Sequence, residues 1–286
     1  MQNIKLWAFL SSVRWYNILL IVLAQYISAF FVFNSFPESL LTVTYDINLH
    51  LIVLCTMLVV AGGFLINDFY DFERDLIARP KVTLLHQYVS KNARLKLYVA
   101  FNFLAFILAL IGSFQILLYF IALSIGLWTY SHKFKKIPLI KEVWASLLTV
   151  SCFFSVALRY DFFDWTVTYY GIYFVLLLFT RQIVKGYEEI KADLVMRNLS
   201  IAGILGDKKT RRIIQFSIVF QLLFSLFLFH QFFPKIWLYY IFISDVILVG
   251  IFISLFKIRH GELYLINFIY KILIVLGIFN LSVLLV

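Results

Sequence analysis

Long apolar runs separated by short polar segments dominate the pattern of this chain. A helix that crosses a bilayer needs about 20 mostly apolar residues, and this length divides the sequence into nine candidate spans. They lie near residues 14–34, 48–66, 97–114, 116–131, 143–158, 165–184, 213–231, 236–256 and 263–286. Only Gly112, Ser113 and Gln115 interrupt the apolar run between the third and fourth spans. The pattern predicts an all-α, polytopic membrane protein, with one transmembrane domain over residues 1–286.

Composition supports the same class. Of the 286 residues, 63% are hydrophobic and 14% are charged, whereas soluble domains are about 45–50% apolar and about 25% charged. This excludes a water-soluble globule, and the high hydrophobicity excludes disorder. The two cysteines, Cys55 and Cys152, lie in apolar runs and match no metal or disulfide spacing. We therefore interpret both as small buried hydrophobic residues.

The net charge of +10 is interpreted as membrane topology rather than as a nucleic-acid surface. With the N-terminus in the cytoplasm and nine spans, 22 of the 25 lysines and arginines fall on the cytoplasmic side. Three segments that carry motifs then face the cytoplasm, near residues 67–96, 131–142 and 185–212. We expect an integral protein of an inner or cytoplasmic membrane, in contact with membrane lipids and without a nucleic-acid partner. The sequence names no protein partner.

The first acidic segment, residues 67–75, closes the second span and reads Asn-Asp-Phe-Tyr-Asp-Phe-Glu-Arg-Asp. On a helix, Asn67, Asp71 and Asp75 fall within roughly 80° of one another, with Asp68 close by. Like charges at this spacing destabilise a bare helix, so a cation is expected to offset them. Mg²⁺ prefers oxygen ligands and shares its coordination shell with phosphates and water. The segment therefore predicts an Mg²⁺ site, although a solvated helix end is the plain alternative.

Two further polar segments share this side of the membrane. In the second acidic segment, residues 181–193, Glu189 and Asp193 lie one turn apart, and Lys185 and Lys191 interleave with them. Carboxylates bind metal and basic groups bind phosphate oxygens, so the mixture suits a metal–diphosphate site, or else an ordinary charged helix. The segment from Tyr130 to Lys136 is purely basic beyond its start and is a candidate anion clamp, or else a positive-inside anchor.

These motifs together resemble the intramembrane prenyltransferases of the UbiA superfamily, over essentially the whole chain. Asn67, Asp68, Asp71 and Asp75 match that family's first aspartate-rich motif. The stretch from Arg181 to Gly206 resembles the second motif and its tail, and Tyr130-Ser131 followed by lysines resembles the tyrosine–lysine segment. Arg14 and Asn17 resemble the start of the family's first helix, with Trp15 in place of proline. Lys271 with Gly277 resembles the pattern of its last helix.

The resemblance implies a fold of nine helices, a polyprenyl diphosphate donor, Mg²⁺ and an active site that opens to the cytoplasm. It implies one ion on Asn67, Asp68, Asp71 and Asp75 and a second on Glu189 and Asp193. Catalytic roles fall on Asp68, Asp71 and Tyr130. Donor binding falls on Asn17, Asn67, Arg79, Lys135, Lys185 and Lys191. Of these, Arg79, Lys135, Lys185 and Lys191 would neutralise the leaving diphosphate, and Tyr130 or Asn17 would shield the allylic cation.

The chain departs from the family pattern at two instructive places. Gly186 stands where the second motif usually has its first aspartate, and Glu189 is a longer carboxylate than the usual aspartate. After Pro138, Lys141-Glu142 replaces the usual Gly-Asn. This chain is therefore identified as a divergent member of the superfamily.

Several alternatives stay open. The acceptor could be a glycerol phosphate lipid, whose branch of the family the chain resembles most, an aromatic quinone precursor or a tetrapyrrole. A non-catalytic binder of isoprenoid diphosphate and a membrane transporter belong to other classes. The acids favour the enzyme over the transporter, because they gather at helix ends and transport sites lie near the midplane. Asp245 and Lys271 lie inside spans, where they pair with each other or line an interior.

Overall fold

The computed structural model describes residues 2–33, 40–160, 164–195, 200–257 and 260–285. Every regular element within these residues is helical, as the hydrophobic pattern predicts. In chain order they are α1 (Gln2–Ser12), α2 (Trp15–Ser28), η1 (Ala29–Phe33), α3 (Leu40–Thr44), α4 (Ile47–Ala78), α5 (Pro80–His86), α6 (Lys91–Gly112), α7 (Phe114–His132), η2 (Phe134–Lys136), α8 (Ile140–Phe154), α9 (Ala157–Tyr160), α10 (Trp165–Glu188), α11 (Ile190–Val195), α12 (Ile201–Phe232), α13 (Leu238–Ser254), η3 (His260–Glu262), α14 (Leu263–Asn280) and η4 (Leu281–Val283).

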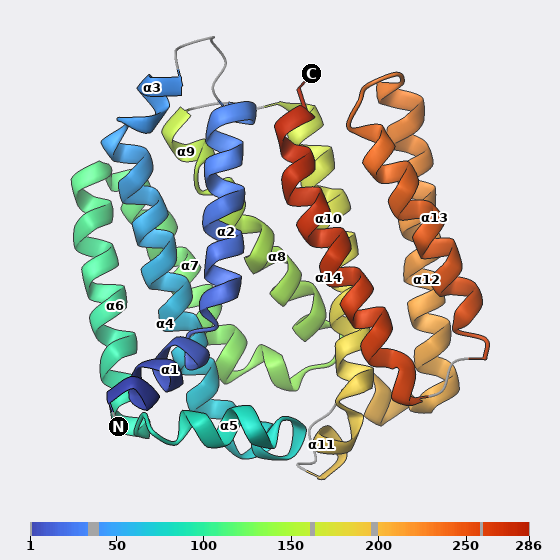
Figure 1. Cartoon of the computed structure of the whole chain (residues 1–286), viewed down its shortest axis with the longest axis horizontal. Coiled ribbons are helices and arrows are strands. Elements are labelled where there is room, and N and C mark those ends of the chain that lie inside the picture. The colour runs from blue at the N-terminus through green and yellow to red at the C-terminus, as the bar shows by residue number, and fades with distance from the viewer. Residues whose placement is uncertain (1, 34–39, 161–163, 196–199, 258–259, 286) are drawn as a thin grey trace.

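The long helices run alongside one another as a bundle, and the two termini lie at its opposite ends (Figure 1). Eight helices of the described chain are long and apolar enough to cross a bilayer, and α13 is a shorter apolar helix of 17 residues. The chain is therefore an integral, multi-pass membrane protein. An odd number of crossings fits the opposite termini, while the count of nine and the cytoplasmic N-terminus stay predictions.

The polar interruption after the third predicted span is a real helix boundary. Helix α6 ends at Gly112, and the Ser113 side chain accepts a hydrogen bond from the backbone N–H of Ile116 at 3.1 Å. A serine at this position satisfies an otherwise unpaired N–H of the new helix. The boundary thus lies where the sequence placed it.

Helix α4 extends well past its apolar part. Its 32 residues correspond to about 48 Å, which exceeds a hydrocarbon core of about 30 Å. The first acidic segment occupies its last turns, so the predicted motif loop from residue 67 begins as helix. Arg79 ends α4, and Pro80 starts α5, where proline is favoured because it needs no N–H acceptor.

Short helices close one end of the bundle. Helices α1, α5 and α11 lie across its lower end in Figure 1. Helix α12 approaches from the same end and breaks at Gly206, whose φ of 74° favours glycine. The motif segments near residues 67–96, 131–142 and 185–212 all reach this end, and they are largely helical rather than open loops.

Packing divides the bundle around two central helices. Helix α4 packs against α6 and α7, whereas α10 packs against α8, α12 and α14. Helix α2 is held between the two groups by a buried polar contact: the Gln25 amide donates to Thr56 Oγ1 on α4 and to Ser155 Oγ at the end of α8, each at 2.8 Å. Inside a membrane such groups must be satisfied by the protein itself. Helix α2 therefore forms a fixed wall of the cavities described below.

Candidate active site

The first acidic segment faces a cavity of about 170 Å³ at the lower end of the bundle, here called the small cavity. Asn67, Asp71 and Asp75 all line it, because residues four and eight apart share one face of α4. Asn67 and Asp71 are buried. The predicted grouping of these three oxygen-bearing side chains is therefore present in the structure.

The second acidic segment reaches the same cavity from α10. Helix α10 ends at Glu188, and Glu189 caps it with a non-helical φ of −91° and ψ of 12°. Glu189, Lys185 and Gly186 line the small cavity. Asp193 does not line it: it lies on α11, and its side chain is 1% exposed. Glu189 and Asp193 are thus separated by a helix boundary and do not share a regular helical face.

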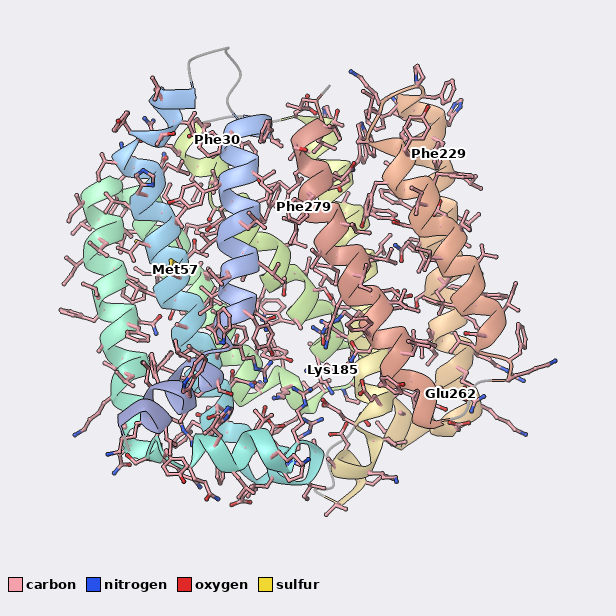
Figure 2. All side chains as sticks on the ribbon, viewed as in Figure 1. Phe30, Met57, Lys185, Phe229, Glu262 and Phe279 are labelled. Atoms are coloured by element: carbon pink, nitrogen blue, oxygen red, sulfur yellow. The ribbon has the colours of Figure 1, made fainter. Side chains whose placement is uncertain are left out.

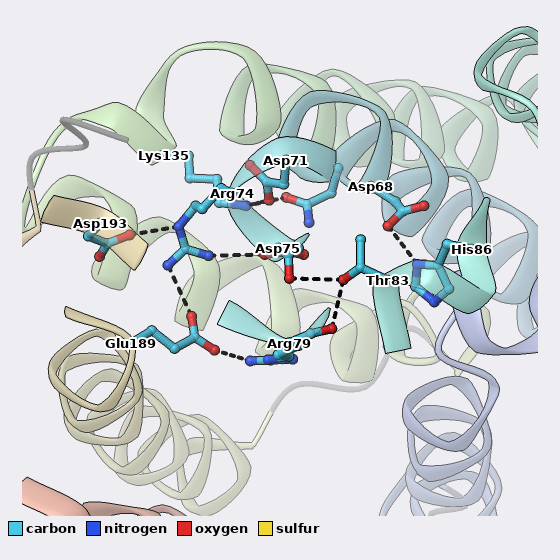
Figure 3. A network of polar contacts seen from close by, with 11 residues as sticks. Asp68, Asp71, Arg74, Asp75, Arg79, Thr83, His86, Lys135, Glu189 and Asp193 are labelled. Carbon is cyan, nitrogen blue, oxygen red and sulfur yellow. Dashed lines mark hydrogen bonds and ion pairs between the residues drawn. The ribbon is translucent and has the colours of Figure 1, made fainter. Parts of the chain in front are cut away.

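Arg74 joins the two acidic segments. Its Nε lies 2.6 Å from Asp193 Oδ1, its Nη2 lies 3.0 Å from Glu189 Oε2, and its Nη1 lies 3.2 Å from Asp75 Oδ1 (Figure 3). The guanidinium is only 9% exposed, so these contacts form in a low-dielectric setting where charge-assisted hydrogen bonds are strong. Sequence reasoning missed Arg74, although it stands inside the first segment, one residue before Asp75.

Arg79 makes a second link, with an ion pair to Glu189 (Figure 3). Burial alone would raise the pKa of Glu189, but the positive charges of Lys185, Arg79 and Arg74 outweigh it and lower the pKa below its usual range. Burial alone would likewise lower the pKa of Arg79, but the charge of Glu189 raises it above its ordinary value. Both groups are therefore ionised at neutral pH.

Lys135 brings the basic segment to the first acidic segment. It is ion-paired with Asp71, and its ammonium donates to Asn67 Oδ1 at 2.9 Å. The same ammonium lies 6.0 Å from the centre of the Tyr130 ring. Tyr130 and Lys135 both line the small cavity. The basic segment is therefore beside the acids, which favours its interpretation as an anion clamp.

Asp68 points elsewhere. Its Oδ1 lies 2.8 Å from His86 Nδ1, and its Oδ2 lies 3.1 Å from Arg94 Nη1; His86 in turn contacts Ser11 Oγ at 3.0 Å. Asp68 does not line the small cavity. The sequence grouped it with Asp71 as a metal ligand and catalytic residue, but the structure uses both of its oxygens to hold α5 and α6 against α4.

A second, larger cavity of about 570 Å³ adjoins the first. Seven residues line both cavities: Arg14, Ile21, Phe64, Arg79, Thr149, Gln182 and Lys185. Asn17 lines the large cavity, as do the apolar side chains Leu20, Phe153 and Phe174. Lys185 lies toward the closed end of the bundle (Figure 2). Lys191 is exposed on α11 and lines neither cavity, so its predicted contact with diphosphate is absent from this arrangement.

Cationic side chains outnumber carboxylates around the small cavity. Three carboxylates line it, and six cationic side chains surround them: Arg14, Arg74, Arg79, Lys135, Lys141 and Lys185. The excess of positive charge suits a strongly anionic ligand such as a diphosphate. The sequence pointed to Arg14 only through its resemblance to the start of the family's first helix. It pointed to Lys141 only as a departure from the family's usual Gly-Asn.

The oxygen-bearing side chains of the small cavity suit Mg²⁺. Asn67, Asp71, Asp75 and Glu189 supply oxygen atoms to one cavity, which is the chemistry that Mg²⁺ requires. Among the described residues, no three His, Cys, Asp or Glu side chains are close enough to hold an ion as they stand. The carboxylates of this cavity are instead paired with Arg74, Arg79 and Lys135. The residues fit an ion that binds together with an anionic ligand. The three cations can then pair with that ligand and leave the carboxylates to the ion.

Comparison with known proteins identifies the relatives of this arrangement. The model of the UbiA prenyltransferase family matches residues 39–272. Digeranylgeranylglyceryl phosphate synthase of Saccharolobus solfataricus is 28% identical over 173 residues, which are 59% of this chain and 60% of that protein. The synthase of the same name from Methanococcus maripaludis strain C6 is 29% identical over 68% of this chain and 70% of its own length.

Solved structures show the same fold. A digeranylgeranylglyceryl phosphate synthase in membranes superposes with a TM-score of 0.72 and 22% identity, over the whole of both chains. A UbiA homologue from Archaeoglobus fulgidus, bound to GPP and Mg²⁺, has a TM-score of 0.67 and 15% identity, over 96% of this chain and 99% of its own. At these identities the likeness concerns the fold.

Proposed function

Because the chain belongs to the UbiA prenyltransferase family, we propose that it transfers a polyprenyl group from an isoprenoid diphosphate to the free hydroxyl of a prenylated glycerol phosphate. The observation that carries this proposal is the meeting of two acidic segments and six cationic side chains at one cavity. This combination suits a diphosphate with its metal ion better than either a neutral ligand or a bare cation.

The acceptor follows from the names of the relatives. The two synthases reported above are named for digeranylgeranylglyceryl phosphate. Removal of one geranylgeranyl group from that product leaves geranylgeranylglyceryl phosphate, a lipid alcohol with a phosphate monoester. The matched stretch spans about 60% of the length of the S. solfataricus protein, so donor and acceptor are proposals for this chain.

Mg²⁺ would be held by Asn67, Asp71 and Asp75 from α4 and by Glu189 from α10, and it would neutralise charge on the diphosphate oxygens. Arg79, Lys135 and Lys185 line the same cavity and would receive the leaving diphosphate. Asp68 acts as a positioning residue, since its contacts with His86 and Arg94 fix the last turns of α4. Asp193, bound to Arg74, ties α11 to the end of α4.

The reaction exchanges one carbon–oxygen bond for another. The bond between C1 of the donor and the diphosphate oxygen breaks, and the diphosphate leaves with the electron pair. The acceptor oxygen then forms an ether bond to C1, and its hydroxyl proton departs to the diphosphate. The Tyr130 ring beside Lys135 and the Asn17 amide would face the allylic cation between these steps. Both side chains line the cavities.

The large cavity would take the donor chain. Its volume of about 570 Å³ lies within the range of about 300–1,000 Å³ for ligand pockets, and Leu20, Phe153 and Phe174 supply apolar walls. A dry, apolar surround keeps water from the cation. We place the small cavity on the cytoplasmic side, because the basic residues concentrate on the side that the positive-inside pattern assigns to the cytoplasm.

The test uses the full chain purified in detergent. Labelled geranylgeranyl diphosphate and Mg²⁺ are incubated with geranylgeranylglyceryl phosphate, an aromatic quinone precursor or a tetrapyrrole. We expect labelled product with the glycerol phosphate lipid, and its loss in Asp71→Ala. Glu73→Ala is the matched control, since Glu73 is an exposed carboxylate two residues away that lines neither cavity.

Three results would overturn the proposal. Product with an aromatic or tetrapyrrole acceptor alone would reassign the acceptor. Mg²⁺-dependent donor binding without turnover on any acceptor would favour a non-catalytic binder, and neither binding nor turnover would revive the transporter hypothesis.

A further inference from the structure

Two cations in the large cavity have no acidic partner. Arg181 lies on α10 and Lys271 on α14, and both line this cavity. Within the described part of the chain neither forms an ion pair, and the Nε of Arg181 is buried without a hydrogen-bond acceptor. Arg181 as a whole is half-buried and Lys271 is exposed, but a buried N–H donor without an acceptor is costly. The pair is therefore a candidate binding site for an anionic group.

Both cations lie at one depth in the bundle. Arg181 precedes the end of α10 by seven residues, which is about 10 Å, and Lys271 follows the start of α14 by eight residues, which is about 12 Å. These helix ends lie at the same end of the bundle (Figure 1). Charges inside membrane spans are rare and mark binding sites when they face an interior. This pair faces the large cavity and lies deeper in the bundle than Glu189.

Glu188 is close enough to act on both charges of the pair but forms an ion pair with neither. Glu188 is the one carboxylate among the described residues that line the large cavity, and its Oε2 accepts a hydrogen bond from Asn267 Nδ2 at 2.7 Å. Asp245, which the sequence offered as a partner for Lys271, instead accepts from Ser225 Oγ at 2.9 Å on α12. Five cations line the large cavity: Arg14, Arg79, Arg181, Lys185 and Lys271.

An unpaired amide oxygen, Asn267 Oδ1, lies on the same helix as Lys271. Asn267 lies one turn before Lys271 on α14, and its Oδ1 is buried without a donor. An incoming ligand with both anionic oxygens and a hydroxyl group would satisfy the two cations and this acceptor together. Phosphate monoesters of polyols carry both kinds of group.

We propose that Arg181 and Lys271 bind the phosphate headgroup of the acceptor, separately from the donor diphosphate in the small cavity. This inference rests on the proposed function and adds the site that selects a phosphorylated acceptor. Arginine binds phosphate oxygens in a bidentate way, and lysine adds a point charge. Arg79, Gln182 and Lys185 line both cavities, so an acceptor held at this pair lies next to the diphosphate.

The test compares two acceptors that differ only in the phosphate. Wild type, Lys271→Gln, Arg181→Gln and Lys271→Arg are placed in phosphatidylcholine nanodiscs as full chains. Binding of labelled geranylgeranylglyceryl phosphate and of neutral geranylgeranylglycerol is measured without donor, and KM is measured for each with donor. Lys136→Gln is the control, because it removes an exposed lysine that lines neither cavity.

We expect each Gln variant to bind the phosphorylated acceptor on the order of tenfold more weakly, since it loses a charge-assisted hydrogen bond to the phosphate. Binding of the neutral acceptor and the KM of the donor stay near wild type, and Lys271→Arg restores binding. Removal of a charge from a span is tolerated by the fold, which a thermal unfolding curve checks.

The inference is overturned if the Gln variants weaken both acceptors equally, or if they weaken neither. It is also overturned if phosphatidic acid competes as well as the acceptor, because the pair then binds ordinary bilayer lipid. Selective loss of phosphate binding without any turnover would support this site and refute the transferase function. Turnover that is unchanged in the variants would do the reverse.

Discussion

The two acidic segments reach the same cavity by different structural means. The first segment lies on the unbroken end of α4, where a spacing of four residues directs Asn67, Asp71 and Asp75 to one face. The second crosses the end of α10, so that Glu189 caps one helix and Asp193 lies on the next. Local helix geometry positions the first segment, whereas contacts from elsewhere in the chain must position the second.

Those contacts come from the first segment and its extension. Arg74 binds both Glu189 and Asp193, and Arg79 binds Glu189 again. The comparison teaches that the second acidic segment has no geometry of its own and is held by two arginines at the end of α4. Each of the following predictions tests this dependence.

The largest effect is expected from Arg74→Gln. The substitution leaves Asp193 buried without its cationic partner and removes one of the two arginines that bind Glu189. Breaking a buried ion pair costs about 3–5 kcal/mol. We expect a clear loss of thermal stability in detergent and prenyl transfer below about 1% of wild type. Differential scanning fluorimetry and the labelled-donor assay measure the two effects.

Arg74→Lys and Arg212→Gln are the controls for this prediction. Lysine keeps the charge but lacks the planar fork of donors that reaches three carboxylates, so stability should recover partly. Arg212 is an exposed arginine of α12 that lines neither cavity, and its loss should change nothing. An Arg74→Gln protein as stable as wild type would show that the second segment positions itself.

The next effect separates the two segments directly. We expect Asp71→Asn to lower kcat by about 100-fold or more and Glu189→Gln by about tenfold, because Asp71 has one cationic partner whereas Glu189 is shared by two arginines and gives less of its charge to the ion. Steady-state rates at saturating Mg²⁺ and donor give both numbers. Equal losses would mean that the two segments contribute alike, which contradicts the comparison.

The same contrast explains how far the sequence could predict the fold and the site. The spans, the break at Ser113 and the shared face of Asn67, Asp71 and Asp75 follow from periodicity and helix capping, which are local. The two cysteines are buried and free, as expected. Helix α1 was not predicted as a separate element; it precedes Arg14, whose φ of 50° turns the chain into α2.

Contacts between helices could not be predicted from periodicity. Asp68 is adjacent to Asn67 in sequence, yet His86 and Arg94 from α5 and α6 engage both of its oxygens. The reach of Arg74 to α11 could not be predicted, because nothing local in the sequence indicates it. Lys271 and Asp245 looked like possible partners on consecutive helices, but Asp245 turns to Ser225 on α12.

The smallest effect is expected where the second segment lacks a carboxylate. A Cβ atom at Gly186 would lie 3.9 Å from Glu142 Oε1 and 3.9 Å from Lys141 Nζ, which is ordinary contact, so an aspartate fits there and faces the small cavity. Gly186→Asp adds an oxygen ligand to the weaker segment. We expect the Mg²⁺ concentration for half-maximal transfer to fall about threefold, since affinity rises with ligand charge.

Gly186→Asn is the matched control, because it has nearly the same volume without the charge. If the asparagine variant shows the same shift as the aspartate variant, the effect comes from replacing a helix glycine, which stiffens the end of α10. If only the aspartate variant lowers the Mg²⁺ concentration for half-maximal transfer, the effect comes from the added charge. One carboxylate then makes the second segment more like the first. A rise in the Mg²⁺ requirement would mean that Glu142, buried beside this position, repels the added charge and already occupies its place.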